Sequence, residues 1–297
     1  MVAGSKNTAF TGCTRAVVGV YRGCVPSSIP FVVVFSDIDD VFADAHTAYD
    51  TAASVLAQLG QDEAALVLCS SRTRAQLDLI QQRLSIRHPF ICEYGRAVGV
   101  PVSYFDFEIP HLHSRGSCEA IEFGRPYADV VDVLHRTAER LDIRVVGFSD
   151  MSIGDVAREL HVPLLEARLA KLREYVEPFR VLNPNPGDRE RLFKALRGVR
   201  LQCTIGDRFD YVGSPIDLSA GVNLLNNLYK AAHGTILRAA FSHVPREQGA
   251  LQRVDRYFVQ SPQEGGAAPI GVADWADAIV GAVRQLQRRR WPASHFG

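Results

Sequence analysis

The sequence has no net charge and no long hydrophobic segment, and both absences restrict what the protein can be. Its 33 basic and 33 acidic side chains cancel over 297 residues, which argues against the basic surface typical of nucleic-acid-binding proteins. No apolar run approaches the roughly 20 residues that cross a bilayer. We therefore expect no nucleic-acid partner and no membrane partner. Hydrophobic residues make up 47% of the chain, enough for the core of one large domain or two smaller ones.

Cysteine and glycine signatures are also missing. The six cysteines are scattered, with no Cys-x-x-Cys pair and no Cys/His spacing typical of a metal site. Such cysteines are typical of free thiols in a reducing compartment, so we expect a cytoplasmic protein. No glycine-rich signature of a nucleotide- or dinucleotide-binding turn follows an expected strand, which argues against that class of domain.

Hydrophobic patterning predicts an α/β fold. Residues 31–35 and 64–69 are short β-branched or aliphatic runs, typical of parallel strands buried on both faces. They are followed by amphipathic stretches, 45–59 and 72–84, with helical spacing. Alternation of this kind predicts βαβ units around a parallel sheet.

The pattern changes in the middle of the chain and returns near residue 201, which predicts an α+β insert. We expect an N-terminal extension at 1–30, a Rossmann-like core formed by 31–88 and 201–290, and an inserted domain at 89–200. The further expected strands and helices are 118–123, 126–141, 143–148, 152–160, 163–175, 178–182, 188–197, 201–205, 209–212, 217–232, 235–241, 257–260 and 271–288, with loops at 101–117 and 261–270.

Two carboxylates directly follow the first expected strand. Asp37 and Asp39 would lie at its carboxyl end, the edge at which open α/β sheets bind ligands. Being two residues apart in an extended segment, they face the same side. One carboxylate could attack phosphorus while the other, protonated, donates to the leaving oxygen. The alternative is a solvated Asx turn without catalytic function.

Hydroxyl groups follow the next strand. Ser70 and Ser71 stand at its end, beside an expected helix start, where hydroxyl and backbone N–H groups can hold a phosphate. The alternative is a serine that only caps the helix.

Together these segments resemble the haloacid-dehalogenase (HAD) superfamily of phosphatases and, more narrowly, the mannosyl-3-phosphoglycerate phosphatase family. The similarity extends over about residues 31–260, and its most family-specific part is 147–179. The similar stretches are 35–39, 68–74, 89–95, 122–127, 147–151 and 170–179.

The resemblance implies a HAD-like Rossmann-type core with a parallel sheet and an inserted α+β cap domain. It implies Mg²⁺ in the core, Asp37 as the nucleophile, Asp39 as the general acid and Ser70 as a phosphate ligand. The cap would contact the sugar and glycerate of a small phosphorylated substrate. The candidates for these contacts are Glu93, Lys171, Arg173 and Glu174, although such side chains also occur on merely solvated helix faces.

The chain departs from the family pattern at three places. Asp40 and Val41 replace a glycine and a threonine, and Leu218 replaces a lysine that neutralises phosphate charge. His243 and Glu247 stand where metal-binding aspartates are expected. We therefore expect a metal site formed by Asp37, Asp39, His243 and Glu247. A histidine among its ligands would favour Mn²⁺ or Zn²⁺ over Mg²⁺, unless the site has decayed. Arg246 or Arg238 could replace the charge of the lysine.

Two hypotheses on function follow from these motifs. In the first, the protein is a phosphoric monoester hydrolase that acts on a phosphorylated sugar or sugar-glycerate through an aspartyl-phosphate intermediate. In the second, it is a pseudophosphatase that binds a sugar phosphate or a partner protein without turnover.

Overall fold

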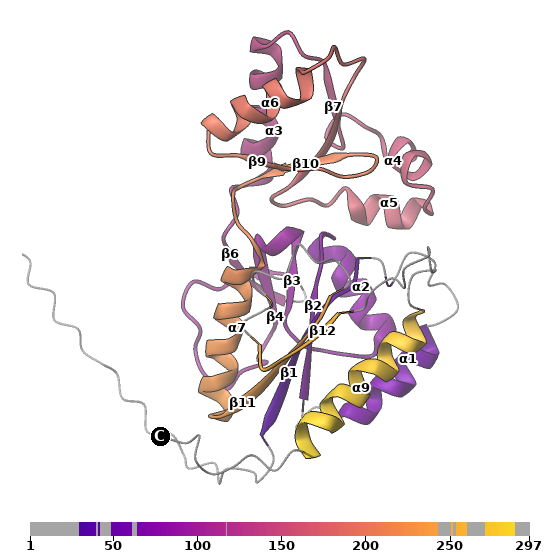
Figure 1. Cartoon of the computed structure of the whole chain (residues 1–297), viewed down its shortest axis with the longest axis vertical. Helices are drawn as coiled ribbons and strands as arrows, with labels where there is room; N and C mark the ends of the chain where they lie inside the picture. The colour runs from indigo at the N-terminus through magenta and orange to yellow at the C-terminus, as the bar shows by residue number, and fades with distance from the viewer. Residues whose placement is uncertain are drawn as a thin grey trace, which may run out of the picture.

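The computed structural model describes residues 30–39, 41, 49–60, 64–116, 118–242, 251, 254–259 and 271–288 (Figure 1). Residues 1–29 of the expected extension and the whole of loop 261–270 lie outside these ranges. Asp40, His243, Arg246, Glu247 and residues 45–48 of the first expected helix also lie outside them.

A large mixed sheet forms the core. Its order is β12(Arg256–Val259), β11(Ile236–Ser242), β1(Phe31–Asp37), β2(Ala64–Cys69), β3(Phe90–Cys92), β4(Ala97–Pro101), β6(Cys118–Glu122) and β5(His113–Arg115). The strands from β12 to β3 are parallel, and those beyond β3 pair antiparallel. The predicted α/β class with a parallel sheet is therefore confirmed.

Strand β1 is buried on both faces because every residue from Val32 to Phe35 is apolar and successive side chains alternate between faces. Val32 and Val34 pack among the helices α1(Tyr49–Leu56), α2(Arg74–Leu84) and α9(Val272–Arg288). Val33 and Phe35 pack on the opposite face, which α7(Leu218–His233) covers. Figure 1 shows α1 and α9 side by side on their face of the sheet. The result is a three-layer core in which β1 is central.

A second, four-stranded antiparallel sheet lies beyond the carboxyl ends of the core strands (Figure 1). Its order is β7(Val145–Gly147), β8(Glu177–Val181), β10(Asp210–Gly213) and β9(Gln202–Thr204). One hydrophobic cluster joins this sheet to α3(Tyr127–Arg140) and α6(Asp188–Gly198). Another cluster contains residues of α4(Ile153–Leu160) and α5(Leu164–Ala170). We call the part from α3 to β10 the cap.

Some segments differ from their sequence-based assignment. The expected loop 101–117 contains β5, and the expected strand at 118–123 is hydrogen-bonded into the core sheet as β6. The expected helix 163–175 ends at Ala170. The division of the chain into core and insert at residues 89 and 200 stays a prediction. By strand pairing, β3 to β6 belong to the core sheet, and the second sheet begins with β7.

No helix among the described ranges has the length and apolar character needed to cross a membrane. Cys92, Cys118 and Cys203 are free thiols, as expected for these three positions.

Candidate active site

Asp37 is the last residue of β1, and its side chain is almost completely buried. Its Oδ1 accepts the backbone N–H of Asp39 at 3.0 Å, which closes an Asx turn of the kind considered from the sequence. This turn bends the chain immediately after the strand. It leaves both aspartates at the carboxyl end of β1, beside the loop after β2 that the cap contacts.

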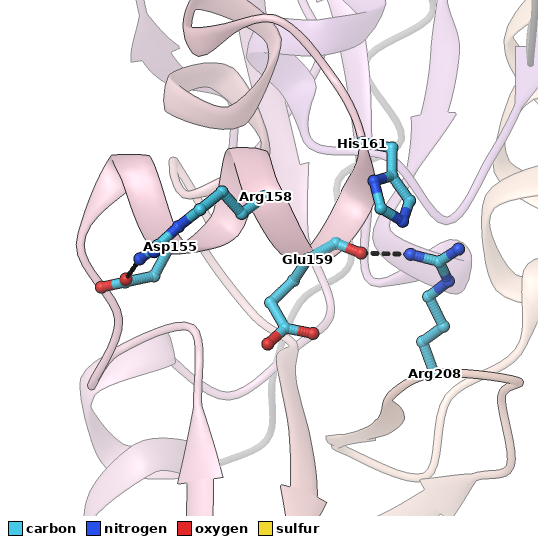
Figure 2. A pocket seen from close by; sticks show the side chains of 5 residues that line it. All are labelled: Asp155, Arg158, Glu159, His161 and Arg208. Carbon is cyan, nitrogen blue, oxygen red and sulfur yellow. Dashed lines mark hydrogen bonds and ion pairs between the residues drawn. The ribbon is translucent and has the colours of Figure 1, made fainter.

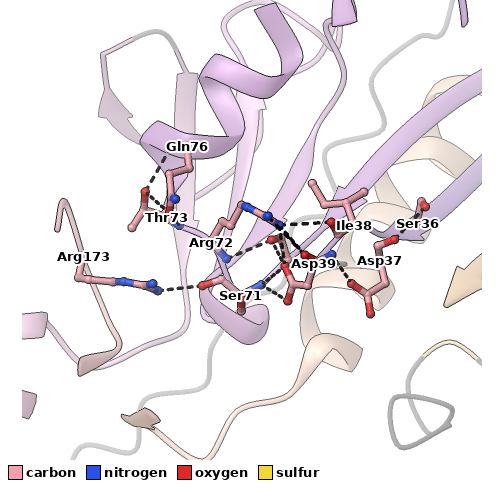
Figure 3. A network of polar contacts seen from close by, with 10 residues as sticks. Ser36, Asp37, Ile38, Asp39, Ser71, Arg72, Thr73, Gln76 and Arg173 are labelled. Atoms are coloured by element: carbon pink, nitrogen blue, oxygen red, sulfur yellow. Dashed lines mark hydrogen bonds and ion pairs between the residues drawn. The ribbon is translucent and has the colours of Figure 1, made fainter. Parts of the chain in front are cut away.

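The carboxylate of Asp39 is bound by the loop that follows β2 (Figure 3). The backbone N–H of Ser71 donates to both of its oxygens, at 3.1 Å to Oδ1 and 2.9 Å to Oδ2. The Ser70 hydroxyl also donates to Oδ1 and accepts the Arg72 N–H at 3.1 Å. The structure therefore brings together the four predicted residues Asp37, Asp39, Ser70 and Ser71. The capping role is taken by Thr73 instead of Ser70, because the Thr73 hydroxyl accepts the Gln76 N–H in a capping box.

Arg72 completes this network and was not assigned a role from the sequence. Its Nη1 lies 3.3 Å from Oδ1 of Asp39, 3.2 Å from the Ile38 carbonyl oxygen and 3.3 Å from the Asp39 carbonyl oxygen. Its Nη2 also donates to the Asp39 carbonyl oxygen, at 3.3 Å. One guanidinium thus binds a carboxylate and two carbonyl oxygens, which its planar, multi-donor geometry permits.

The cap reaches this loop through the segment that follows α5. Arg173 donates from Nη1 to the Ser71 carbonyl oxygen at 2.8 Å (Figure 3). Glu174 forms a two-pronged ion pair with Arg74 at the start of α2, with N–O distances of 3.1 and 3.2 Å. Two of the predicted cap residues therefore lie at the junction with the core. Arg173 has no partner for its Nη2 among the residues that the structure describes.

Glu93 occupies a different environment from the one expected of a substrate contact. Its side chain is fully buried and accepts three backbone N–H groups of the cap, those of Glu174, Tyr175 and Val176, at 2.8–3.1 Å. Burial raises the pKa of its carboxyl group, whereas nearby Arg173 and the three donors oppose that rise. This geometry suits a residue that positions the cap segment, and a contact between Glu93 and substrate stays a prediction.

Lys171 also binds backbone atoms. Its ammonium group donates to the carbonyl oxygens of Phe148 and Met151, and so it holds the turn after β7. A buried side-chain cluster that was not predicted lies beside this turn: the Glu177 carboxylate accepts hydrogen bonds from the hydroxyls of Tyr127 and Ser149. Burial raises the pKa of Glu177, and both hydroxyls counteract the rise. As a substrate contact, Lys171 likewise stays a prediction.

Leu218 supplies no positive charge to the site, and Arg238 on β11 does not replace it. Leu218 is a buried first residue of α7. Arg238 pairs with Asp255 through both ends of its guanidinium, at 3.1 and 3.0 Å, and lies beside Val33, four residues before Asp37. The guanidinium of Arg173 contacts the Ser71 carbonyl oxygen, and that of Arg72 contacts the Asp39 carboxylate.

Two of the four predicted metal ligands, Asp37 and Asp39, belong to the described residues. Among the described residues, no group of three or more His, Cys, Asp or Glu side chains has a metal-binding arrangement. The predicted ligands His243 and Glu247 lie outside the described ranges. The Asp39 carboxylate already accepts the Ser71 N–H and pairs with the Arg72 guanidinium, so a cation at this carboxylate would have to displace the arginine. Asp37 fits Mg²⁺ better, because proteins often hold this ion with one or two carboxylates and the phosphate oxygens of the substrate.

A separate pocket of about 390 Å³ lies on the cap (Figure 2). Its charged side chains are largely paired. Arg158 binds Asp155, Arg208 binds the Glu159 carbonyl oxygen, and the Glu159 carboxylate pairs with Arg180. The residues that line this pocket do not include Asp37 or Asp39. We therefore place the candidate site at these two aspartates, at the junction of core and cap, and not in this pocket.

Comparison with solved structures defines the class of fold. A phosphatase of the haloalkanoate (HAD) enzyme superfamily from Bacteroides thetaiotaomicron superposes with a TM-score of 0.52 at 13% identity, covering 91% of this chain and 99% of that one. At this identity the likeness concerns the fold alone. The predicted HAD-like architecture, a Rossmann-type core with a cap, is confirmed.

Sequence comparison narrows the resemblance. A glucosyl-3-phosphoglycerate/mannosyl-3-phosphoglycerate phosphatase from Methanococcoides burtonii is 28% identical over 261 residues, which cover 84% of this chain and 96% of the relative. A mannosyl-3-phosphoglycerate phosphatase from Pyrococcus furiosus is 26% identical over 67% of this chain and 78% of its own length. No protein-family model matches the sequence. The predicted resemblance to these phosphoric monoester hydrolases is confirmed.

Proposed function

We propose that this protein is a metal-dependent phosphatase that hydrolyses the phosphate monoester of a glycosyl-3-phosphoglycerate, with glucose or mannose as the sugar. The observation that carries the proposal is the cluster of Asp37, Asp39 and the Ser70–Ser71 loop at the carboxyl edge of the core sheet. The names of the two sequence relatives supply the substrate class. Free thiols at Cys92 and Cys118 support a reducing compartment such as the cytoplasm.

In the proposed reaction, a carboxylate oxygen of Asp37 attacks phosphorus. The bond between phosphorus and the glycerate oxygen breaks, and Asp39 delivers a proton to that oxygen. Water then attacks phosphorus and gives a proton to Asp39, and the bond to Asp37 breaks to release phosphate. After the second step Asp37 is again a free carboxylate and Asp39 is again protonated.

The other residues of the loop would bind the phosphoryl group. The Ser70 hydroxyl and the N–H groups around Ser71 would donate to its oxygens once Asp39 turns toward the leaving group. Arg173, which already contacts Ser71, would contribute positive charge from the cap. Mg²⁺, held by Asp37 and the substrate phosphate, would neutralise the negative charge that collects around phosphorus. Mn²⁺ is the alternative if His243 is a ligand.

Phosphate release from a panel of sugar phosphates and glycosyl-3-phosphoglycerates tests this function. The purified full-length protein would be assayed with Mg²⁺, Mn²⁺ or Zn²⁺, beside Asp37→Asn and Asp39→Asn. We expect release from a glycosyl-3-phosphoglycerate that depends on the metal and is lost in Asp37→Asn. Tight binding of these compounds without any release would refute the phosphatase proposal and identify a binding protein instead.

A further inference from the structure

Two tyrosines from different sheets meet beside the candidate site. Tyr94 lies in the turn between β3 and β4, and Tyr211 lies on β10 of the cap. Their ring centroids are 5.4 Å apart and the ring planes are tilted by 59°. Both side chains are only partly buried. They therefore form a small aromatic surface that the core and the cap share.

The backbone of Tyr94 is unusual for an aromatic residue. Glu93, Tyr94 and Gly95 have consecutive positive φ angles of 45°, 59° and 90°. Glycine is needed at position 95, since a Cβ there would lie 2.5 Å from the Asp217 carbonyl oxygen. Asparagine or glycine would suit position 94 better than tyrosine, because a bulky side chain is disfavoured in this region. Residues held in such conformations cluster at ligand sites.

The loop that binds Asp39 also holds this turn in place. The N–H of Tyr94 donates to the Ser70 carbonyl oxygen at 3.2 Å, and the N–H of Glu93 donates to the Arg72 carbonyl oxygen at 3.1 Å. The backbone of Tyr94 is thus fixed relative to the loop that would bind phosphate.

The surroundings of both rings combine an apolar surface with charge. Burial raises the pKa of Tyr211, Arg173 opposes the rise, and Asp39 adds to it. Burial also raises the pKa of Tyr94, Tyr211 and Asp39 add to the rise, and Arg173 opposes it. Arg173 and Asp39 both bind the backbone of Ser71, the neighbour of the residue whose carbonyl oxygen accepts the Tyr94 N–H. A ligand at this surface would meet aromatic faces, phenol hydroxyls and a guanidinium together.

We infer that Tyr94 and Tyr211 form the subsite for the sugar ring of the substrate and so determine its specificity. The inference rests on the proposed function and adds two residues that the sequence motifs do not include. A pyranose ring has C–H faces that pack on aromatic rings and hydroxyls that pair with tyrosine and arginine. With phosphate at Ser70–Ser71, the sugar would extend toward the cap, which contacts this loop through Arg173 and carries Tyr211.

The test compares glucosyl-3-phosphoglycerate with 3-phosphoglycerate, which lacks the sugar. The quantity measured is the ratio of kcat/KM for the two compounds and, by calorimetry, the ratio of their dissociation constants. The variants are Tyr94→Asn, which suits the positive φ, and Tyr211→Leu, which keeps an apolar side chain. Tyr104→Phe is the matched control, because Tyr104 packs against Tyr229 on the α7 side of the core.

We expect the wild-type protein and Tyr104→Phe to prefer the glycosylated compound. Tyr94→Asn and Tyr211→Leu should each lower that preference by about tenfold, the loss typical of a removed aromatic contact. Unchanged ratios in both variants would overturn the subsite and leave the ring pair as packing between core and cap. If no variant or wild-type protein releases phosphate, the proposed function fails, but the ratio of dissociation constants still decides the subsite.

Discussion

The guanidinium of Arg72 holds the carboxylate of Asp39, with 3.3 Å between Nη1 and Oδ1, while the same nitrogen binds the Ile38 carbonyl oxygen at 3.2 Å. The two side chains are about a quarter exposed or less. The arginine thus joins the segment after β1 to the segment after β2. Because Asp39 is the proposed general acid, the arginine sets its position in the absence of substrate.

This relationship predicts that Arg72 acts through Asp39. Arg72→Lys keeps the charge but loses the planar set of donors, and we expect kcat to fall by about tenfold with little change in thermal stability. Steady-state phosphate release with glucosyl-3-phosphoglycerate measures the effect. Arg136→Lys, on the exposed face of α3, is the control and should keep wild-type kcat. An Arg72→Lys variant with the kcat of the control would contradict this role.

Glu93 is expected to stabilise the fold. In Glu93→Gln, an amide nitrogen replaces one carboxylate oxygen and faces backbone N–H donors of residues 174–176, so at least one buried donor loses its acceptor. The free energy of unfolding should fall by about 1–3 kcal/mol. Urea denaturation followed by circular dichroism measures it. Glu108→Gln, at an exposed position, should change the free energy by less than about 0.5 kcal/mol. Equal stability of the two variants would show that the three hydrogen bonds contribute nothing.

We expect the buried side chain of His88 to make the fold less stable in acid. Burial lowers its pKa from 6.5 to about 4, while its Nδ1 lies 2.8 Å from the Tyr104 hydroxyl oxygen. Between these two values the unfolded chain binds a proton that the folded chain does not, so the stability of the fold falls as the pH is lowered from 6.5 to 4. The loss from this residue approaches about 3 kcal/mol.

His88→Gln removes this titration and keeps a polar side chain. The decrease in unfolding free energy between pH 6.5 and 4 should therefore be smaller in the variant than in the wild-type protein. Denaturation curves at several pH values measure both slopes. Identical slopes would mean that His88 has the same pKa in the folded and unfolded chains.

The strands nearest the site could be predicted because burial on both faces makes them uniformly apolar, as in β1 and β2. Strands β5 and β4, farther along the sheet, could not be predicted from the sequence. All residues of β5 are exposed, and its sequence His-Ser-Arg becomes a strand only through pairing with β6. Strand β4 contains Gly99, which weakens the pattern. This glycine is required by its partner in the register, since a Cβ would lie 2.4 Å from the Phe90 ring.

The site residues also divide into those that the sequence predicts and those that it does not. Asp37, Asp39, Ser70 and Ser71 could be found because each lies at the end of a core strand or within two residues of it, and the topology alone brings strand ends together. The role of Arg72 could not be seen, since an arginine after two serines is also a common residue near a helix start. Tyr211 and Glu177 depend on contacts between distant segments. Lys171 has the chemistry of a substrate ligand, but the fold directs its ammonium group to backbone carbonyls.

The covalent state of Asp37 during turnover decides whether this residue is the nucleophile. The protein would be mixed with glucosyl-3-phosphoglycerate and Mg²⁺, quenched in acid within the first turnover, digested and examined by mass spectrometry. We predict that the peptide containing Asp37 carries the mass of one phosphoryl group, and that the adduct is absent in Asp37→Asn. Phosphate release by the wild-type protein without this adduct, or continued release by Asp37→Asn, would show that Asp37 is not the nucleophile.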